Sequence, residues 1–409
     1  MKIEYLARHS DDPNTFLYLE RYINADSRTY SPFAHQSEGD LKYHPAGDTE
    51  SFEVPCLEIP KEKIMIYLDK PNSQLLNHYI RKETVLFPVH PEIFADVTIP
   101  VIKELRKYPS TSICVSPTAS TRTVMTVAKK TDLPKHFIKL HYPKRISRYI
   151  RRLRSNTIQD SIEVSKNLEN FTIGKFAYYP ETIGMTYGFD PEAWGFIIRE
   201  TTLRPVSEKK RFLIPLFALY CQDTKNPDDL PLLVQLIQFL NEDPQIFTLN
   251  HIMKPIIQIW CTVLRERGFL FEMHGQNTLL ELDIHQLSPC RIVYRDLDVY
   301  VDPMIREQHQ LPLPFPKTHL ITYENREKLY SLKYDAFIGH HLFDYLARLL
   351  EQYFGVNSKA LQKSCKETFR QFFQDADLYF TNKTFYYSNE ISPDNKVKVI
   401  ETNNPPKWR

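Results

Sequence analysis

Apolar residues recur at helical spacing in several stretches of the chain. This spacing predicts helices at Phe16–Ile23, Ile158–Leu168, Phe212–Cys221, Leu230–Leu240, His251–Arg267 and Tyr334–Tyr353. The helix over His251–Arg267 is expected to end at Gly268, because glycine readily adopts the left-handed conformation that closes many helices. Most of these stretches follow residue 210, so the second half of the chain is expected to be mainly helical.

Shorter apolar runs predict strands. These runs are Ile113–Val115, Thr123–Val127, His136–Tyr142, Thr278–Ile284 and Arg291–Val301. A short polar turn containing Ser288 and Pro289 joins the last two runs, so they are predicted to form a hairpin. A further apolar segment lies at Gly195–Glu200.

The predicted hairpin carries a concentration of polar ligands. The sequence EMHGQN, Glu272–Asn277, directly precedes its first strand. Alternation along its second strand places Asp296 and Asp298 of the RDLD sequence on the same face. Oxygen ligands of this kind, beside an imidazole at His274, suit Mg²⁺ held between the protein and phosphate groups. The alternative interpretation is a polar hairpin with an acidic pair at the surface.

A hydroxyl-rich loop lies between two of the predicted strands. The sequence SPTASTRT, Ser116–Thr123, offers hydroxyl and backbone N–H groups together with the guanidinium of Arg122. These donors can surround phosphate oxygens even without glycine. A Ser/Thr-rich turn of no special function is the alternative.

Basic residues follow this loop. Lys139 lies in the next predicted strand, and a basic run extends over Lys144–Arg154. On a helix, several of its cations would share one face, which in most proteins is simply solvated. Since no aromatic-rich basic surface accompanies the run, nucleic acid is not an expected partner.

Composition limits the class of protein. The chain has 409 residues, 42% hydrophobic and 25% charged, with a net charge of +2, as expected of an ordinary globular protein. Its six scattered cysteines form no CxxC pair, which predicts reduced, buried thiols in a cytoplasmic protein. The N-terminal residues contain no apolar signal core, and Phe212–Cys221, the most apolar run, is too short to span a bilayer, so no membrane association is expected.

Five short segments of the chain, taken together, resemble one family. The chain is similar to the siderophore synthetases that work independently of non-ribosomal peptide synthetases, the aerobactin synthetase (IucA/IucC) family with a ferric-reductase-like (FhuF-like) C-terminal part. The matching segments are PVHP at Pro88–Pro91, PTASTRT at Pro117–Thr123, Lys139 with Arg151 twelve residues later, Glu272–Asn277, and RDLD at Arg295–Asp298. The resemblance covers roughly residues 80 to 350.

The resemblance implies a fold. That fold is α+β and described as a cupped hand, with an N-terminal α/β part and a C-terminal helical palm around a small antiparallel sheet. It implies a synthetase domain over residues 1–205 and a ferric-reductase-like domain over residues 206–409, with ATP between them. It also suggests a homodimer, for which the aromatic-rich C-terminal part would supply apolar surface, although the monomer core is an equally good place for those aromatics. These residues are Phe369, Phe372, Phe373, Tyr379 and Phe380.

The resemblance also implies an activity with ATP and Mg²⁺ as cofactors. A citrate-like or dicarboxylate substrate attacks the α-phosphate of ATP, pyrophosphate leaves, and an amine, hydroxylamine or alcohol then displaces AMP to give an amide or ester. Because the first step brings two anions together, it requires cations that act most strongly in the transition state.

Roles for individual residues follow from the same resemblance. Cations from Arg122, Lys139 and Arg151 would stabilise the phosphates, with hydrogen bonds from Ser120 and Thr123. His274 would donate to the developing oxyanion or to phosphate. The remaining roles are metal ligation by Glu272, Asn277 and Asp296, with nucleotide contacts from Gln276 and Asp296 and site shaping by Asp298.

One departure from the family pattern leaves the acceptor half of the site open. The chain lacks the N-terminal GHPxHPxxK segment that helps hold the carboxylate in the family, so it is expected to be shortened at the N-terminus. Candidates to replace that segment are Arg199 and the pair His340–His341. Three functions stay open at this point: an active ligase, a shortened nucleotide-binding homologue that is inactive alone or needs a partner subunit, and a phosphotransferase.

Overall fold

The protein is described by a computed structural model that covers residues 1–10, 12–24, 38–127, 133–146, 149–388 and 398–409. The chain forms two compact units. The helical unit consists of Met1–Ala34, Phe171–Tyr178 and Pro205–Arg409, and the sheet unit consists of His35–Asn170 and Tyr179–Arg204. One junction lies at residue 205, as in the expected division into residues 1–205 and 206–409, although that assignment to family domains remains a prediction.

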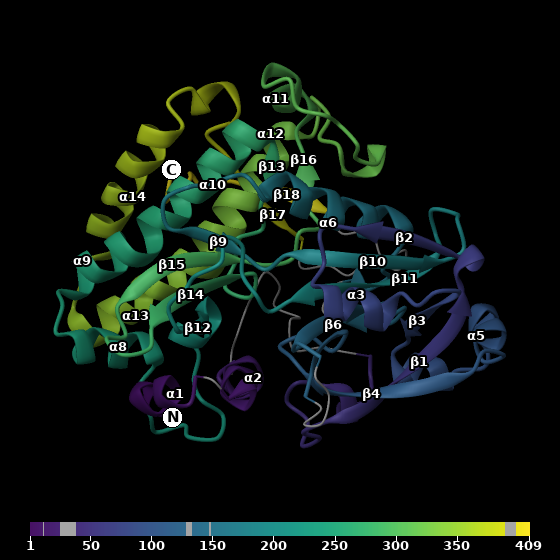
Figure 1. Ribbon diagram of the computed structural model, residues 1–409. Helices are drawn as coiled ribbons and strands as arrows, with labels where there is room; N and C mark the ends of the chain where they lie inside the picture. Colours follow the sequence, from purple (N-terminus) through teal and green to yellow (C-terminus); the bar gives the residue numbers. More distant parts are fainter. Residues whose placement is uncertain (11, 25–37, 128–132, 147–148, 389–397) are drawn as a thin grey trace. The chain divides into compact units, whose positions relative to one another are not determined.

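The sheet unit is built on eight strands, each of which pairs with its neighbours in antiparallel orientation (Figure 1). In spatial order they are β2 (Ile64–Leu68), β10 (Glu181–Tyr187), β11 (Trp194–Glu200), β6 (His136–Leu140), β5 (Thr123–Thr126), β4 (Ser110–Pro117), β1 (Phe52–Pro60) and β3 (Thr84–Pro88). The unit also contains the short hairpin of β7 (Arg145–Ile146) and β8 (Tyr149–Ile150), the helices α3 (Ser73–Tyr79), α4 (Pro91–Ala95), α5 (Pro100–Leu105) and α6 (Ser155–Leu168), and the 3₁₀ turns η1 (Leu41–Tyr43) and η2 (Lys61–Lys63).

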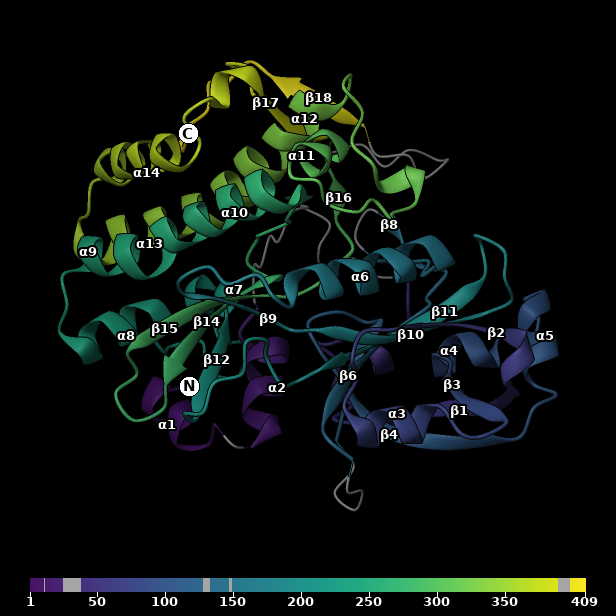
Figure 2. The same cartoon turned by 45° about the horizontal axis from the view of Figure 1, so that its top comes forward.

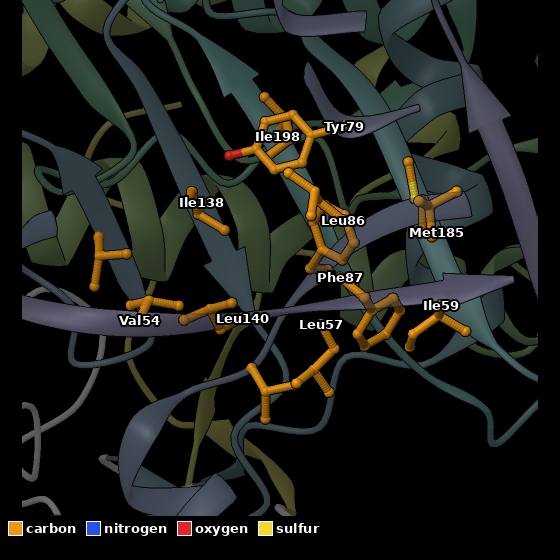
Figure 3. Close-up of a cluster of buried hydrophobic side chains, with 14 of the residues drawn as sticks. Val54, Leu57, Ile59, Tyr79, Leu86, Phe87, Ile138, Leu140, Met185 and Ile198 are labelled. Atoms are coloured by element: carbon orange, nitrogen blue, oxygen red, sulfur yellow. The ribbon is translucent and has the colours of Figure 1, made fainter. Parts of the chain in front are cut away.

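One face of this sheet carries the apolar core. Alternation along β6 directs Ile138 and Leu140 into a cluster with side chains from β1, β3, β10 and β11 (Figure 3). The residue between them, Lys139, therefore belongs to the opposite face. In the strand register, Lys139 pairs with Thr123 of β5 on one side and with Ile197 of β11 on the other.

Helix α6 covers β10 and β11 on that opposite face (Figure 2). Ile158 on α6 packs with Ile197 of β11 and is fully buried. The close packing of α6 on β10 requires a glycine in that strand, because a Cβ atom at Gly184 would lie 2.4 Å from the Cγ2 atom of Ile158. Gly184 lies within β10, where the missing side chain makes room for the helix.

The helical unit combines helices with a small sheet. Its helical segments are α1 (Ile3–Arg8), α2 (Pro13–Tyr22), α7 (Leu216–Tyr220), α8 (Leu232–Leu240), α9 (Pro244–Thr248), η3 (Leu249–Met253), α10 (Lys254–Arg267), α11 (Pro303–Gln308), η4 (Lys317–His319), α12 (Arg326–Ser331), η5 (Leu332–Phe343), α13 (Asp344–Phe354), α14 (Ser358–Phe372) and η6 (Ala376–Leu378). The small sheet has the order β12 (Arg211–Pro215), β14 (Thr278–Asp283), β15 (Pro289–Tyr294) and β9 (Phe176–Tyr178), and only β9 pairs in parallel. The unit also contains two antiparallel strand pairs, β13 (Phe269–Leu270) with β16 (Tyr300–Val301) and β17 (Thr384–Tyr387) with β18 (Val399–Thr402).

Two long helical rods dominate this unit (Figure 1). The first ends with α10 at Gly268, which has φ 70° as its sequence predicts. The second runs through α12, η5 and α13, and its central segment η5 has π-helical turns. Such turns are rare in proteins and often mark functional segments.

The α+β class, the hairpin of β14 and β15 and most of the predicted elements are confirmed. Three expectations are wrong. Phe212–Cys221 begins as strand β12 and becomes helical only at Leu216, while part of the basic run Lys144–Arg154 forms the hairpin of β7 and β8. The run Arg291–Val301 is not one strand, because Arg295–Val299 separates β15 from β16 and Asp296 has a φ of 77°. Strand alternation therefore does not apply to Asp296 and Asp298.

Three of the five aromatic residues singled out in the C-terminal part lie in the core of the helical unit. Phe369, Phe373 and Phe380 are all buried and have ring centroids 5.6 to 5.7 Å apart. These three residues supply no apolar surface for a homodimer, whereas Phe372 and Tyr379 are partly exposed, so the homodimer remains a prediction. All six cysteines are free thiols, and burial raises the pKa of Cys56 and Cys365 to about 12. Among the described residues, no helix combines the length and apolar character needed to cross a membrane.

Replacing Gly184 by alanine is expected to lower the free energy of unfolding by roughly 1–3 kcal/mol, because the new methyl group overpacks the contact with α6. The contacting atoms belong to the side chains of Ile158 and Ile162. Ile158→Ala should therefore relieve part of the penalty, and a double-mutant cycle measured by chemical denaturation should be non-additive. Strictly additive costs would contradict this packing.

The positive φ of Asp296 gives a second stability prediction. Both Asp296→Gly and Asp296→Ala remove the carboxylate, but only glycine adopts this backbone conformation without strain. The glycine variant should therefore be more stable than the alanine variant by about 1 kcal/mol in denaturant titrations. Equal stability of the two variants would argue against a left-handed backbone at this position.

Candidate functional site

The hydroxyl-rich loop of the sheet unit is held in place by strand-like hydrogen bonds. The Oγ1 atom of Thr118 donates to the carbonyl of Thr123 at 2.7 Å, which closes the loop between β4 and β5. The carbonyl of Arg122 accepts the N–H of Leu140 at 2.9 Å, which ties the loop to the end of β6. Ser120 lies within this closed turn and is only partly buried. Its backbone is thus fixed by the neighbouring strands.

The structure brings the predicted phosphate-binding residues of this unit together. Thr123 and Lys139 are register partners on the same face of β5 and β6, and the side chain of Lys139 is almost fully buried. The guanidinium of Arg122 donates to the carbonyl of Arg151 at 3.3 Å, so these residues are also neighbours. This carbonyl also accepts the N–H of Tyr142 at 3.1 Å, which anchors Arg151 beside the end of β6.

His141 lies in this cluster close to several positive charges. Burial, together with the positive charges of Arg122, Arg152 and Arg154, lowers the pKa of His141 to about 3. The neutral imidazole stacks on Trp194 with ring centroids 4.0 Å apart. Sequence reasoning did not single out His141. Its position two residues after Lys139, just beyond the end of β6, is the signal that could have identified it.

The PVHP segment places a buried histidine, His90, in the sheet unit. Burial lowers the pKa of His90 to about 4, and its ring packs against Tyr43 and Tyr142. Glu92 directly follows the PVHP segment. It accepts a 2.5 Å hydrogen bond from the hydroxyl of Tyr142 and forms an ion pair with Lys144. These contacts are those of a structural support.

In the helical unit, the EMHGQN segment forms a tight turn between β13 and β14. The carbonyl of His274 accepts the N–H groups of Asn277 and Thr278, both at 3.1 Å, and the carbonyl of Gly275 accepts the N–H of Phe217 at 3.1 Å. The turn is therefore fixed on both sides, and its polar side chains extend from a rigid backbone.

The hydrogen bonding of His274 determines its tautomer. Its Nδ1 atom accepts the backbone N–H of Gln276 at 3.2 Å, which places the proton of the neutral ring on Nε2. The ring is buried and packs edge-on against Phe337 at 5.4 Å. The hydrogen bond to Nδ1 thus fixes the ring, while the donor role that the sequence resemblance implies remains a prediction.

Glu272 is held from two directions. Its backbone N–H donates to the hydroxyl of Tyr294 at 3.0 Å, and its Oε1 atom forms an ion pair with the ammonium of Lys333 on η5. Lys333 was not predicted from the sequence. It lies 61 positions away along the chain, and no local pattern connects it with Glu272.

The RDLD segment is anchored through its arginine. Arg295 donates to the carbonyl of Gln276 at 2.8 Å and forms an ion pair with Glu20 of α2 at 2.8 Å, and both side chains of this pair are buried. This arginine ties the loop that carries Asp296 to the EMHGQN turn. Asp298 forms a 3.2 Å pair with His319.

The residues predicted to hold Mg²⁺ offer the oxygen chemistry that this ion requires. Glu272, Asn277 and Asp296 supply carboxylate and amide oxygens from two segments that Arg295 links. Lys333 engages one oxygen of Glu272, and the side chain of Glu272 remains 27% exposed. This donor set fits the ion.

Two of the three residues proposed to replace the missing carboxylate-binding segment already form ion pairs. Arg199 donates twice to Glu181, at 2.6 and 3.1 Å, within the buried face of β10 and β11. His340 pairs with Asp344 at 3.1 Å. These contacts reduce the availability of Arg199 and His340 for a substrate carboxylate.

A cavity of about 350 Å³ in the helical unit is separate from the predicted residues. Lys175, Asn250, Lys254 and Gln258 are among its lining residues. None of the residues predicted from the sequence lines it, so it is not part of the candidate site.

No protein-family model matches the sequence, and no sequence among the curated proteins matches it either. Solved structures do match. The chain aligns with the petrobactin biosynthesis protein AsbB from Bacillus anthracis str. Sterne at 14% identity and a TM-score of 0.67, over 98% of this chain and 78% of that chain.

Two further structures come from a hypervirulent pathotype of Klebsiella pneumoniae. ATP-bound aerobactin synthetase IucA aligns at 14% identity and a TM-score of 0.68, over 99% of this chain and 80% of that chain. Aerobactin synthetase IucC aligns at 14% identity and a TM-score of 0.62, over 84% of this chain and 67% of that chain. The chain is therefore an α+β protein with the fold of AsbB, IucA and IucC, the fold that its resemblance to the IucA/IucC family implied.

Proposed function

We propose that this protein is an ATP-dependent ligase of siderophore biosynthesis that joins a carboxylate to an amine, hydroxylamine or alcohol through an acyl-adenylate. The observation that carries this proposal is the hydrogen bonding of His274, a buried histidine whose Nδ1 accepts a backbone N–H within a rigid turn. The cation cluster of the sheet unit and the fold of ATP-bound IucA support it.

The proposed first step is attack of a carboxylate oxygen on the α-phosphorus of ATP, with loss of pyrophosphate. Negative charge accumulates on the phosphate oxygens during this step. Arg122, Lys139 and Arg151 would stabilise that charge, with hydrogen bonds from Ser120 and Thr123. Because the neighbouring strands hold these groups in place before the substrate binds, little reorganisation would accompany the reaction.

In the second step, the nucleophile attacks the acyl carbon and AMP leaves with the former carboxylate oxygen. The Nε2–H of His274 would stabilise the developing oxyanion. Each donor of this kind is typically worth about 10²–10³ in rate. When bound, Mg²⁺ would neutralise phosphate charge, and Glu272, Asn277 and Asp296 would hold it while Gln276 contacts the nucleotide.

A second candidate is a nucleotide-binding homologue that needs a partner subunit for catalysis. The contacts of Arg199 with Glu181 and of His340 with Asp344 favour it, because they occupy groups that could hold the carboxylate. A phosphotransferase has weaker support, since the sequence contains no Gly-rich loop over the phosphates and no HRD-type catalytic segment.

The test is exchange of labelled pyrophosphate into ATP, with citrate, succinate or 2-oxoglutarate present and no nucleophile. The wild-type protein should catalyse exchange with one of these acids, and Lys139→Ala should abolish it. His274→Ala should reduce exchange by about 10²–10³ while changing the calorimetric affinity for MgATP far less, because its donor acts in the transition state.

Two controls make this result interpretable. His309→Ala changes an exposed histidine of the same unit and should leave exchange unaltered. Arg151→Ala should weaken MgATP binding itself. If ATP binds but exchange stays at background with every acid, the ligase proposal fails for the chain alone and the partner-dependent homologue replaces it.

A further inference from the structure

Lys333 is a buried cation in the middle of η5. Its side chain is only 1% exposed, and the rings of Phe337, Tyr300 and Tyr387 lie 4.6, 5.3 and 6.0 Å from its ammonium nitrogen. Among the described residues, Glu272 is the carboxylate within ion-pair distance of this nitrogen. The environment is thus a ring of aromatic faces with one anionic partner.

Such a lysine depends strongly on that partner. A buried ammonium is costly to desolvate unless it is paired, and contacts with aromatic faces recover only part of the cost. The helix that carries it is also well anchored. Trp408 packs against Gly339 of η5, and Arg409 donates to both oxygens of Asp335 at 3.0 Å. Lys333 is therefore fixed beside Glu272.

Glu272 consequently carries a charge that is already balanced. Lys333 contacts its Oε1 atom, and no hydrogen-bond partner of Oε2 occurs within the described parts of the chain. A divalent cation that binds Oε2 would share one carboxylate with a neighbouring ammonium. The two cations would repel each other, and at short range in a partly buried site this repulsion is substantial.

We propose that Lys333 is a resident counter-charge at the metal site, which keeps the affinity of the nucleotide-free protein for divalent cations low. The cation then enters together with ATP, whose phosphates supply the negative charge that Glu272 alone does not provide. This inference rests on the proposed function in one respect, the role of Glu272 as a metal ligand.

Electron paramagnetic resonance of Mn²⁺ with the full chain, without nucleotide, tests the proposal. Lys333→Met removes the charge while keeping a side chain of similar length, and it should tighten Mn²⁺ binding about tenfold or more. Lys333→Arg keeps the charge and should bind Mn²⁺ as weakly as the wild type. Lys383→Met removes a lysine from an exposed pair with Glu401 in the same unit and should have no effect.

A second substitution assigns the effect to Glu272. Adding Glu272→Gln to Lys333→Met should cancel the gain in Mn²⁺ affinity, whereas a general change in protein charge would persist. Thermal unfolding of each variant verifies that it is folded, and Lys333→Gln offers a second neutral side chain if the methionine variant is unstable. Unchanged or weaker Mn²⁺ binding in a folded neutral variant would overturn the proposal.

Binding of MnATP to the wild-type protein is measured in the same series. Failure to bind MnATP would overturn the proposed function. If MnATP binds normally and the neutral variants show no gain for free Mn²⁺, only the counter-charge is wrong.

Discussion

Alternation of side chains along β6 is the constraint on which the candidate phosphate-binding cluster depends. Ile138 and Leu140 enter the apolar core, so the intervening Lys139 is forced onto the opposite face beside Thr123. A shift of one residue in register would place the ammonium in the apolar core and move two large apolar side chains to the face of the polar cluster. Stability of the sheet and placement of the cation are therefore consequences of one register. The same register positions the loop that carries Arg122, because the carbonyl of Arg122 accepts a hydrogen bond from the N–H of Leu140.

In the helical unit, hydrogen bonds and ion pairs within the protein hold the polar side chains of the candidate site in place. The N–H of Gln276 fixes the tautomer of His274, and Lys333 balances the charge of Glu272. Arg295 joins the EMHGQN turn to the RDLD loop and is itself neutralised by Glu20 of α2. Groups held in this way lose little conformational freedom on binding, which is what a site for a highly charged substrate needs.

Sequence reasoning succeeded where local pattern decides the structure. The strand around Lys139, the hairpin of β14 and β15 and the helix end at Gly268 follow from alternation, turn residues and glycine conformation, and the fold followed from the family resemblance. It failed where distant contacts decide. The backbone of Asp296 leaves the extended conformation in a loop pinned by Arg295, and neither Lys333 nor Glu20 has a sequence signal that connects it with the motif it contacts. The residue roles at the site remain predictions, because they concern a reaction and not a fold.

The most direct measurement of the central claim follows an oxygen atom. The protein is given ATP, Mg²⁺, hydroxylamine as the nucleophile, and one acid whose carboxylate oxygens are labelled with ¹⁸O. Citrate, succinate and 2-oxoglutarate are tested in separate reactions. The products are then analysed by ³¹P nuclear magnetic resonance. Attack of the carboxylate on the α-phosphorus predicts that ¹⁸O appears in AMP, with unlabelled pyrophosphate as the other product. Formation of ADP with ¹⁸O in inorganic phosphate would contradict adenylation and identify attack at the γ-phosphorus instead.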